Sequence, residues 1–167
     1  QGDWSSDVCS SDLKILLTDP QWLLLDEPYS NLDLHQKKLI MLLLKEVSEQ
    51  LKIGMIMVSH DASDMLAWAD DLMLIEDGKI IQRGDCFSLY HHPINEYVAG
   101  LLGEYNICDA SMVNLLTHQL DFYEADKQYL IRPEYIFISN DDKGIKAEVT
   151  EVLFKGGYYL VRCYVKV

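Results

Sequence analysis

Basic residues are scarce in this sequence, and long apolar runs are absent. Its 167 residues include 14 Lys and Arg against 27 Asp and Glu, which gives a formal charge of −13 at pH 7. Nucleic-acid affinity depends on clustered Lys and Arg that meet phosphates, so this balance argues against a nucleic-acid partner. The richest apolar runs, LIMLLL and IGMIMV, are six residues long, far short of the roughly 20 that a membrane-spanning helix needs. We therefore expect a globular chain that reaches a membrane only through a partner.

Paired cysteines and a secretory signal are also missing. The four cysteines lie far apart and form no C-x-x-C pair: Cys9, Cys86, Cys108 and Cys163. This spacing indicates neither a zinc site nor a disulfide framework, which favours a reducing compartment. No basic start followed by an apolar segment opens the chain, so we expect a cytoplasmic location.

The opening segment is rich in small and acidic residues. Residues 3–13, DWSSDVCSSDL, resemble the translation of one reading frame of a widely used sequencing-adapter oligonucleotide. A flexible Ser/Asp-rich arm is the alternative that composition permits. We predict that residues 1–13 are a non-native, adapter-derived segment, and that native sequence begins near Lys14. The other end stops on alternating apolar residues, YYLVRCYVKV, which predicts an interrupted sheet.

From Lys14 onward the sequence alternates between strand and helix patterns. KILL resembles the last turn of a helix, and WLLLDEP and GMIMVSH are expected to be short buried strands. Between them lies a helical pattern with Asp33 as N-cap and Gln36 as its capping-box partner. Its apolar face is formed by Leu39, Leu42, Leu43, Val47 and Leu51. A short helix follows in DASDMLAWAD, and the alternation predicts an α/β fold with a parallel sheet and crossover helices.

The second half of the chain has a different pattern. Asp77-Gly78 between two apolar runs predicts an antiparallel hairpin, and CFSLYHH and INEYVAGLLG predict two helices divided by Pro93. Three later segments predict strands: KQYLIRPEYIFIS, IKAEVTEVLF and YYLVRCYVKV, with Gly156-Gly157 at a turn. We expect one domain over residues 14–105 and a partial, all-β domain over residues 106–167.

Adjacent carboxylates follow the first predicted strand. Asp26 and Glu27 would lie at its carboxyl end, where parallel sheets bind ligands, and Ser59-His60 follow the second strand. Phosphoryl transfer needs one carboxylate near the magnesium hydration shell and another that orients the attacking water. Each feature alone has a simpler interpretation: a solvated loop, a structural histidine, or an N-cap at Asp33. The ordered set favours the catalytic interpretation.

These residues carry a family resemblance. LLLDEPYSNLD resembles the Walker B segment and D-loop of ABC-type ATPases, and MVSHD resembles their switch-histidine segment. DGKIIQRGDCFSLYHHPINEYVAGLLGEYN is similar to the end of the ATPase domain in importer subunits of the maltose, polyamine and ferric-iron branch. IRPEYI and the strands expected after it resemble that branch's C-terminal TOBE-type regulatory domain. The resemblance implies an incomplete P-loop NTPase core followed by a partial, OB-like regulatory domain.

The resemblance also implies ligands, partners and residue roles. The ligands would be ATP and Mg²⁺, and Asp26 would act on the metal through water. Glu27 would be the catalytic carboxylate, and His60 would bind the γ-phosphate and help to retain the water. The D-loop would be Ser30, Asn31, Leu32 and Asp33. The implied partners are a second copy of the ATPase subunit, two membrane permease subunits and, indirectly, a solute-binding protein, with the chain peripheral on the cytoplasmic face of the inner membrane.

Two motifs of this family are missing. A P-loop requires G-x-x-x-x-G-K-[ST], and the one Gly-Lys dipeptide, Gly78-Lys79, has Met73 and Ile80 at the other required positions. The glycine-rich LSGGQ signature is absent too. We predict that the intact parent hydrolyses ATP and that this polypeptide alone does not, because the phosphate cradle is lost.

Other readings stay open at the level of sequence. A soluble ABC-type ATPase that is not coupled to transport would share the acidic pair and the D-loop, although IRPEYI favours an importer. A non-enzymatic remnant is the third alternative. The transported solute also stays open among maltose-like sugars, polyamines and iron. For Arg132 and Glu134 in the RPE segment we expect a structural role.

Overall fold

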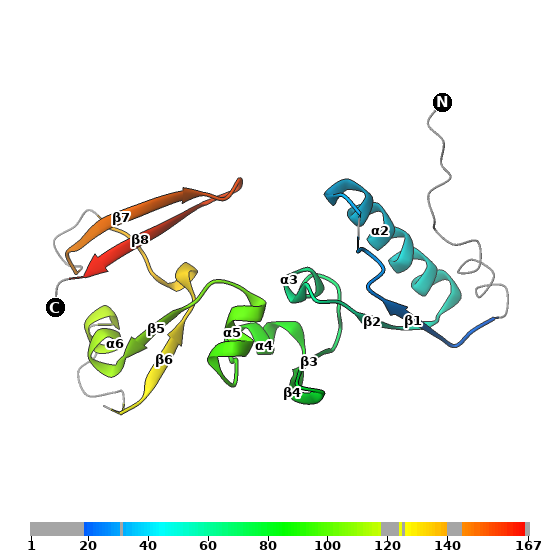
Figure 1. Ribbon diagram of the computed structural model, residues 1–167, viewed down its shortest axis with the longest axis horizontal. Coiled ribbons are helices and arrows are strands. Elements are labelled where there is room, and N and C mark those ends of the chain that lie inside the picture. Colours follow the sequence, from blue (N-terminus) through cyan, green and yellow to red (C-terminus); the bar gives the residue numbers. More distant parts are fainter. Residues whose placement is uncertain (1–18, 31, 118–123, 125, 140–144, 166–167) are drawn as a thin grey trace. The chain divides into compact units, whose positions relative to one another are not determined.

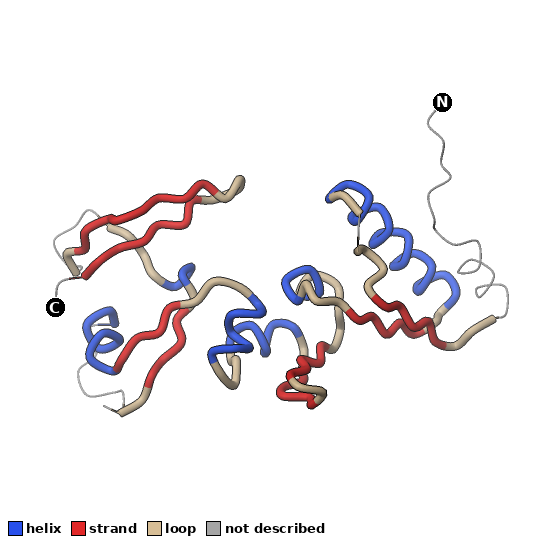
Figure 2. The backbone as a smooth tube through the Cα atoms, viewed as in Figure 1, coloured by secondary structure: helices blue, strands red, loops and turns tan. Residues whose placement is uncertain are grey.

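A computed structural model describes residues 19–30, 32–117, 124, 126–139 and 145–165 of the chain (Figure 1). The adapter-like segment, the KILL turn and Asn31 lie outside the described residues. Contacts divide the chain into two compact units, Gln1–Met65 and Leu66–Val167. The described residues form a mixture of helices and small two-stranded sheets, which are coloured blue and red in Figure 2.

The first unit contains a parallel strand pair joined by a helix. Strand β1 (Trp22–Asp26) is followed by helix α2 (Leu34–Leu51), strand β2 (Gly54–Val58) and the short helix α3 (Ala62–Met65). The two strands pair in parallel from Trp22 opposite Gly54 to Asp26 opposite Val58. Parallel strands need a long connection, and α2 supplies it.

Helix α2 is capped at both ends, by Asp33 at its start and by Lys52 at its end. The Asp33 carboxylate accepts a 2.8 Å hydrogen bond from the Gln36 N–H, and the Gln36 side chain accepts one of 3.2 Å from the Asp33 N–H. The predicted capping box is thus confirmed. At the other end, Lys52 adopts a left-handed conformation with φ of 55° and donates its N–H to the Ser48 carbonyl, which ends the helix.

The expectation that β1 and β2 are buried strands is wrong for this chain. Leu24 is 72% exposed, Ile56 45% and Val58 56%, whereas Leu23 is buried. Most of the apolar positions predicted for the helix are exposed as well: Leu39, Leu42, Leu43 and Leu51. Helix α2 and the short helix α3 offer too little surface to cover both faces of this two-stranded sheet. Most of the apolar pattern of this unit therefore faces solvent.

The second unit begins with an antiparallel hairpin and two short helices. Strands β3 (Leu72–Glu76) and β4 (Lys79–Gly84) are joined at Asp77-Gly78, whose φ angles are 48° and 74°. Positive φ at both positions is the signature of a type I′ turn, so the predicted hairpin is confirmed. Helices α4 (Cys86–His91) and α5 (Glu96–Leu102) follow, as predicted. Their side chains Leu89, Val98 and Leu102 are the largest that are fully buried among the described residues.

Two further strand pairs occupy the rest of the unit. Strand β5 (Asn106–Asp109) pairs antiparallel with β6 (Gln128–Ile131), and β7 (Ala147–Phe154) pairs antiparallel with β8 (Tyr159–Val165). The turn between β7 and β8 contains Gly156 at φ 87°, which confirms the turn predicted at Gly156-Gly157. Between β6 and β7 lies the 3-10 helix η1 (Pro133–Tyr135).

The prediction of an all-β region beyond residue 106 is wrong in one segment. Helix α6 (Ala110–Thr117) follows β5 directly and contacts both β5 and β6. The Asp109 carboxylate accepts hydrogen bonds from the Ser111 hydroxyl (2.6 Å) and the Met112 N–H (2.8 Å), which lower the pKa of Asp109. A carboxylate that caps in this way starts a helix, and burial of Ala110 and Val113 holds it in place.

The strand predicted over KQYLIRPEYIFIS also ends earlier than expected. Strand β6 stops at Ile131, and Pro133 opens the 3-10 helix η1. Proline has no N–H for a strand ladder and a φ near −65°, so the ladder ends before it. Ile136–Ser139 therefore continue outside any strand.

Replacing Asp33 by alanine tests the capping of α2. The Asp33→Ala variant loses the acceptor for the Gln36 N–H, and loss of an N-cap destabilises a helix by about 1 kcal/mol. We expect amides in the first turn of α2 to exchange with deuterium about fivefold faster, measured by hydrogen exchange. Lys38→Ala, an exposed change in the same helix, is the control and should leave exchange unaltered. Equal exchange in both variants would contradict the capping role.

Candidate functional site

The carboxyl ends of β1 and β2 bring the predicted catalytic residues together. The parallel register places Asp26 opposite Val58, and the Glu27 N–H donates a 2.9 Å hydrogen bond to the Val58 carbonyl. This bond continues the ladder by one residue beyond β1. Glu27 itself has a φ of 46°, a conformation that is uncommon for a residue other than glycine or asparagine. The chain therefore turns sharply at Glu27, at the same level as the end of β2.

Glu27 and His60 contact each other directly. One carboxylate oxygen, Oε1 of Glu27, accepts a 2.8 Å hydrogen bond from the His60 backbone N–H. The ring atom Nδ1 of His60 lies 2.8 Å from the same oxygen. The Glu27 side chain is 32% exposed and the His60 side chain 81%. The carboxylate is thus held by two groups of the β2 end, while the imidazole stays open to solvent.

This contact indicates which ring nitrogen of His60 faces Glu27 as a donor. An ionised carboxylate only accepts hydrogen bonds, so Nδ1 of His60 must carry the proton that it shares with Glu27. The neutral ring then leaves Nε2 as an acceptor, whereas the protonated ring presents an Nε2–H donor. A phosphate oxygen needs a donor. With Nδ1 beside Glu27, Nε2 is the ring nitrogen of His60 that is left to meet another group.

The segment after Glu27 forms a tight turn before α2. The Ser30 N–H and hydroxyl both donate to the Glu27 carbonyl, at 3.0 and 2.9 Å, and the Leu32 N–H donates to the Tyr29 carbonyl. Tyr29 is buried, its hydroxyl donates to the Met57 sulfur, and burial raises the pKa of its phenol. Three of the four residues predicted as the D-loop are thus described: Ser30, Leu32 and Asp33. Of these, Ser30 is hydrogen-bonded to the Glu27 backbone.

Asp26 fits a magnesium ion that is held through water. Its side chain is exposed at the end of β1, and Mg²⁺ keeps several waters and binds oxygen ligands from carboxylates and phosphates. When bound beside phosphates, such an ion neutralises their negative charge. Within the described residues, no cluster of three or more His, Cys, Asp or Glu side chains converges on one point. Asp26 would thus contribute one oxygen donor to a site completed by other groups.

The described residues include no loop that fits the phosphates of a nucleotide. A phosphate cradle requires several backbone N–H groups at a helix N-terminus and a lysine. The Gly78-Lys79 dipeptide instead lies in the type I′ turn between β3 and β4. The described residues thus bring Glu27 and His60 together without a loop that could bind a phosphate group.

One residue pair near the site was missed by sequence reasoning. Lys37 in the first turn of α2 lies 3.4 Å from the Asp61 carboxylate, and its ammonium group lies 5.8 Å from the centre of the Tyr29 ring. This pair ties the helix after the turn to the residue that follows His60. The available signal was an acidic residue next to the histidine together with a lysine four residues after the N-cap, which is too common a pattern to single out.

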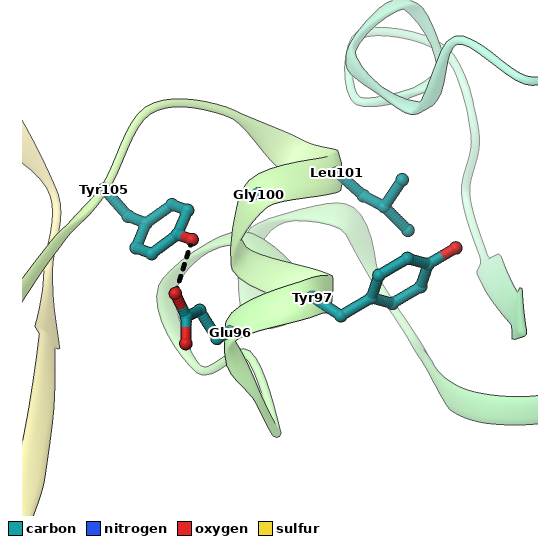
Figure 3. A pocket seen from close by; sticks show the side chains of 5 residues that line it. All are labelled: Glu96, Tyr97, Gly100, Leu101 and Tyr105. Carbon is teal, nitrogen blue, oxygen red and sulfur yellow. Dashed lines mark hydrogen bonds between the residues drawn. The ribbon is translucent and has the colours of Figure 1, made fainter.

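A shallow pocket lies elsewhere, on helix α5. It is lined by Glu96, Tyr97, Gly100, Leu101 and Tyr105 (Figure 3). The Tyr105 hydroxyl donates a 3.0 Å hydrogen bond to Glu96, which raises the pKa of the phenol. None of the predicted site residues lines this pocket. Its wall is formed by the single helix α5 and Tyr105, so we do not assign it to the candidate site.

Comparison with known proteins supports the resemblance to ATP-binding subunits of importers. The chain is 34% identical over 168 residues to the "Spermidine/putrescine import ATP-binding protein PotA" of Mycoplasmopsis synoviae (strain 53). The alignment covers 90% of this chain and 37% of that relative, so the chain spans well under half of the relative's length. No protein family model matches the chain. No helix among the described residues is long and apolar enough to cross a membrane.

Removing the Glu27 carboxylate tests the pair. In the Glu27→Ala variant the His60 ring loses its acceptor, and we expect the neutral imidazole to shift from the Nδ1–H toward the Nε2–H form. Long-range proton–nitrogen NMR of the histidine ring distinguishes the two forms. Asp26→Asn, which changes the neighbouring carboxylate, is the matched control and should keep the Nδ1–H form. An unchanged ring in Glu27→Ala would contradict the hydrogen bond between Glu27 and His60.

Proposed function

We propose that this chain is the C-terminal part of the ATP-hydrolysing subunit of an ABC-type solute importer. The observation that carries the proposal is the contact between Glu27 and His60 at the ends of two parallel strands. The order of the motifs and the similarity to an import ATP-binding protein support it. The transported solute is not part of the proposal, since other subunits select it in this family.

The proposed roles are those that the family resemblance implies, and the geometry of the two strand ends is compatible with them. Glu27 orients the attacking water, and its position at the turn leaves the second carboxylate oxygen available while Oε1 is bonded to His60. His60 contacts the γ-phosphate through its exposed ring. Asp26 acts on Mg²⁺ through water. Ser30, Asn31, Leu32 and Asp33 form the D-loop, which would face a second copy of the subunit.

The exposed apolar residues of the first unit support the proposal that a longer protein supplies the missing parts. Leu24, Ile56 and Val58 on the strands, with Leu39, Leu42 and Leu43 on α2, expose large side chains to solvent. Large exposed apolar faces mark surfaces that another segment or protein covers. In the proposed parent, the remaining strands and the phosphate-binding loop would cover them.

The parent would work as a dimer that drives two permease subunits. It would be peripheral on the cytoplasmic face of the membrane, and a solute-binding protein would deliver the solute. The β-rich end would be part of an OB-like, TOBE-type regulatory domain.

A chimera tests the catalytic role directly. In this chimera, residues 21–167 of the present chain replace the matching segment of the M. synoviae relative. The rest of the chimera comes from the relative and is expected to contain the phosphate-binding loop. We expect ATP hydrolysis by the chimera, and a fall in kcat of about 100-fold or more in Glu27→Gln, because the group that orients water is lost while nucleotide binding is kept. Glu49→Gln, an exposed change on α2, is the control and should leave kcat unaltered. Hydrolysis that survives Glu27→Gln would contradict the proposal.

The isolated chain should be inactive. Residues 14–167 lack a P-loop and the glycine-rich signature, and the charge on a transferring phosphoryl group would therefore find no cradle. We expect no ATP turnover above background in a phosphate-release assay with purified protein. Steady turnover that Glu27→Gln removes would show that the chain is catalytically complete and would contradict this prediction.

A further inference from the structure

Arg132 is the one charged side chain that is buried among the described residues. It is 4% exposed, and its guanidinium group donates five hydrogen bonds to backbone carbonyl oxygens. Nη1 donates to the carbonyls of Ala99, Gly103 and Glu104 at 2.9, 3.1 and 3.0 Å. Nε and Nη2 both donate to the Tyr90 carbonyl, at 3.2 and 3.0 Å. A buried cation without such partners would be very costly.

The four carbonyls belong to the ends of two helices. Tyr90 lies in the last turn of α4, and Ala99, Gly103 and Glu104 lie in or just after the last turn of α5. The last carbonyls of a helix have no partner within it, and a cation near them is favoured by the helix dipole as well. Arg132 therefore satisfies the ends of both helices at once. A lysine lacks the planar fork of donors that reaches two helix ends.

The antiparallel register of β5 and β6 carries Arg132 to this place. Asn106 pairs with Ile131, so the next residue along β6, Arg132, comes opposite the segment that follows α5. The chain thus closes a ring: α5 leads into β5, β5 pairs with β6, and β6 delivers Arg132 back to the end of α5. The guanidinium also lies 4.1 Å from the centre of the Tyr90 ring, a favourable cation–π distance.

Two neighbours of Arg132 add contacts to the same helix. The Tyr90 hydroxyl donates a 2.8 Å hydrogen bond to the Glu134 carboxylate, and the Tyr135 hydroxyl lies 2.7 Å from Nδ1 of His91. The pKa of the Tyr90 phenol is raised, mainly by burial and to a smaller extent by the hydrogen bond to Glu134. Three of the four residues in the RPEY segment thus contact the last two residues of α4. Gly103 leaves room for this arrangement, since a Cβ atom there would lie 3.3 Å from the Tyr90 ring.

We propose that Arg132 is a latch that joins α4 and α5 to β5, β6 and η1 as one rigid body. The predicted domain boundary near residue 105 would then lie inside a rigid element and not at a flexible joint. A movement of the two helices would pass directly to the β-rich segment that follows. This proposal goes beyond the proposed function and does not depend on ATP hydrolysis.

Hydrogen–deuterium exchange on the 167-residue chain tests the latch. In Arg132→Ala, four carbonyls at the ends of α4 and α5 lose a donor, so we expect exchange in α5 and in β5 and β6 to rise together by about tenfold or more. Arg162→Ala is the matched control, because Arg162 is 67% exposed and pairs with Glu151 at 2.8 Å; it should leave these segments unchanged. A rise confined to residues 131–133, or the same rise in Arg162→Ala, would overturn the proposal.

A conservative variant keeps the test decisive if Arg132→Ala does not fold. Arg132→Lys retains the positive charge and removes the fork that reaches both helix ends. We expect faster exchange at α4 or α5 than in the parent chain, together with faster exchange in β5 and β6. Full protection of all these segments in Arg132→Lys would show that a point charge suffices, and it would overturn the latch.

Discussion

The candidate site depends on the parallel register between β1 and β2. With Asp26 opposite Val58, the residue after each strand end falls at the same edge, and the Glu27 N–H binds the Val58 carbonyl. A shift of one residue would turn every side chain to the opposite face and separate Glu27 from His60. The capping box of α2 supports this register, since it fixes where the crossover helix begins. The chemistry of the site is thus a consequence of strand pairing and one helix start.

Sequence reasoning predicted the elements whose signals are local. The Asp33 capping box, the Asp77-Gly78 turn and the Gly156-Gly157 turn depend on residues within four positions of one another, and the structure contains all three. The close approach of Glu27 and His60 could also be predicted from the sequence, because the carboxyl ends of parallel strands lie at the same edge of a sheet. The roles assigned to these two residues rest on family resemblance and stay proposals. The contact between Lys37 and Asp61 joins residues far apart in sequence, and no local pattern indicates it.

Other features depend on tertiary context that a single sequence does not display. WLLLD and GMIMV are patterned for a buried sheet, yet Leu24 and Val58 face solvent because no described layer covers them. Helix α6 was missed since its start relies on the Asp109 side chain, which also ends a strand. The burial of Arg132 is the clearest case: only the pairing of β5 with β6 brings this cation onto the ends of α4 and α5. Arg132, a charged residue next to an apolar run, thus becomes a buried hydrogen-bond donor to the two helix ends.

The most direct test of the central claim is the DNA sequence upstream of the Lys14 codon in the source organism. The account predicts an open reading frame in place of DWSSDVCSSDL that encodes a P-loop, G-x-x-x-x-G-K-[ST], and a glycine-rich signature close to Lys14. Such a sequence would supply the phosphate cradle that the roles proposed for Glu27 and His60 require. A start codon followed directly by the encoded opening segment would contradict the account, because this chain would then lack the means to bind a nucleotide for hydrolysis.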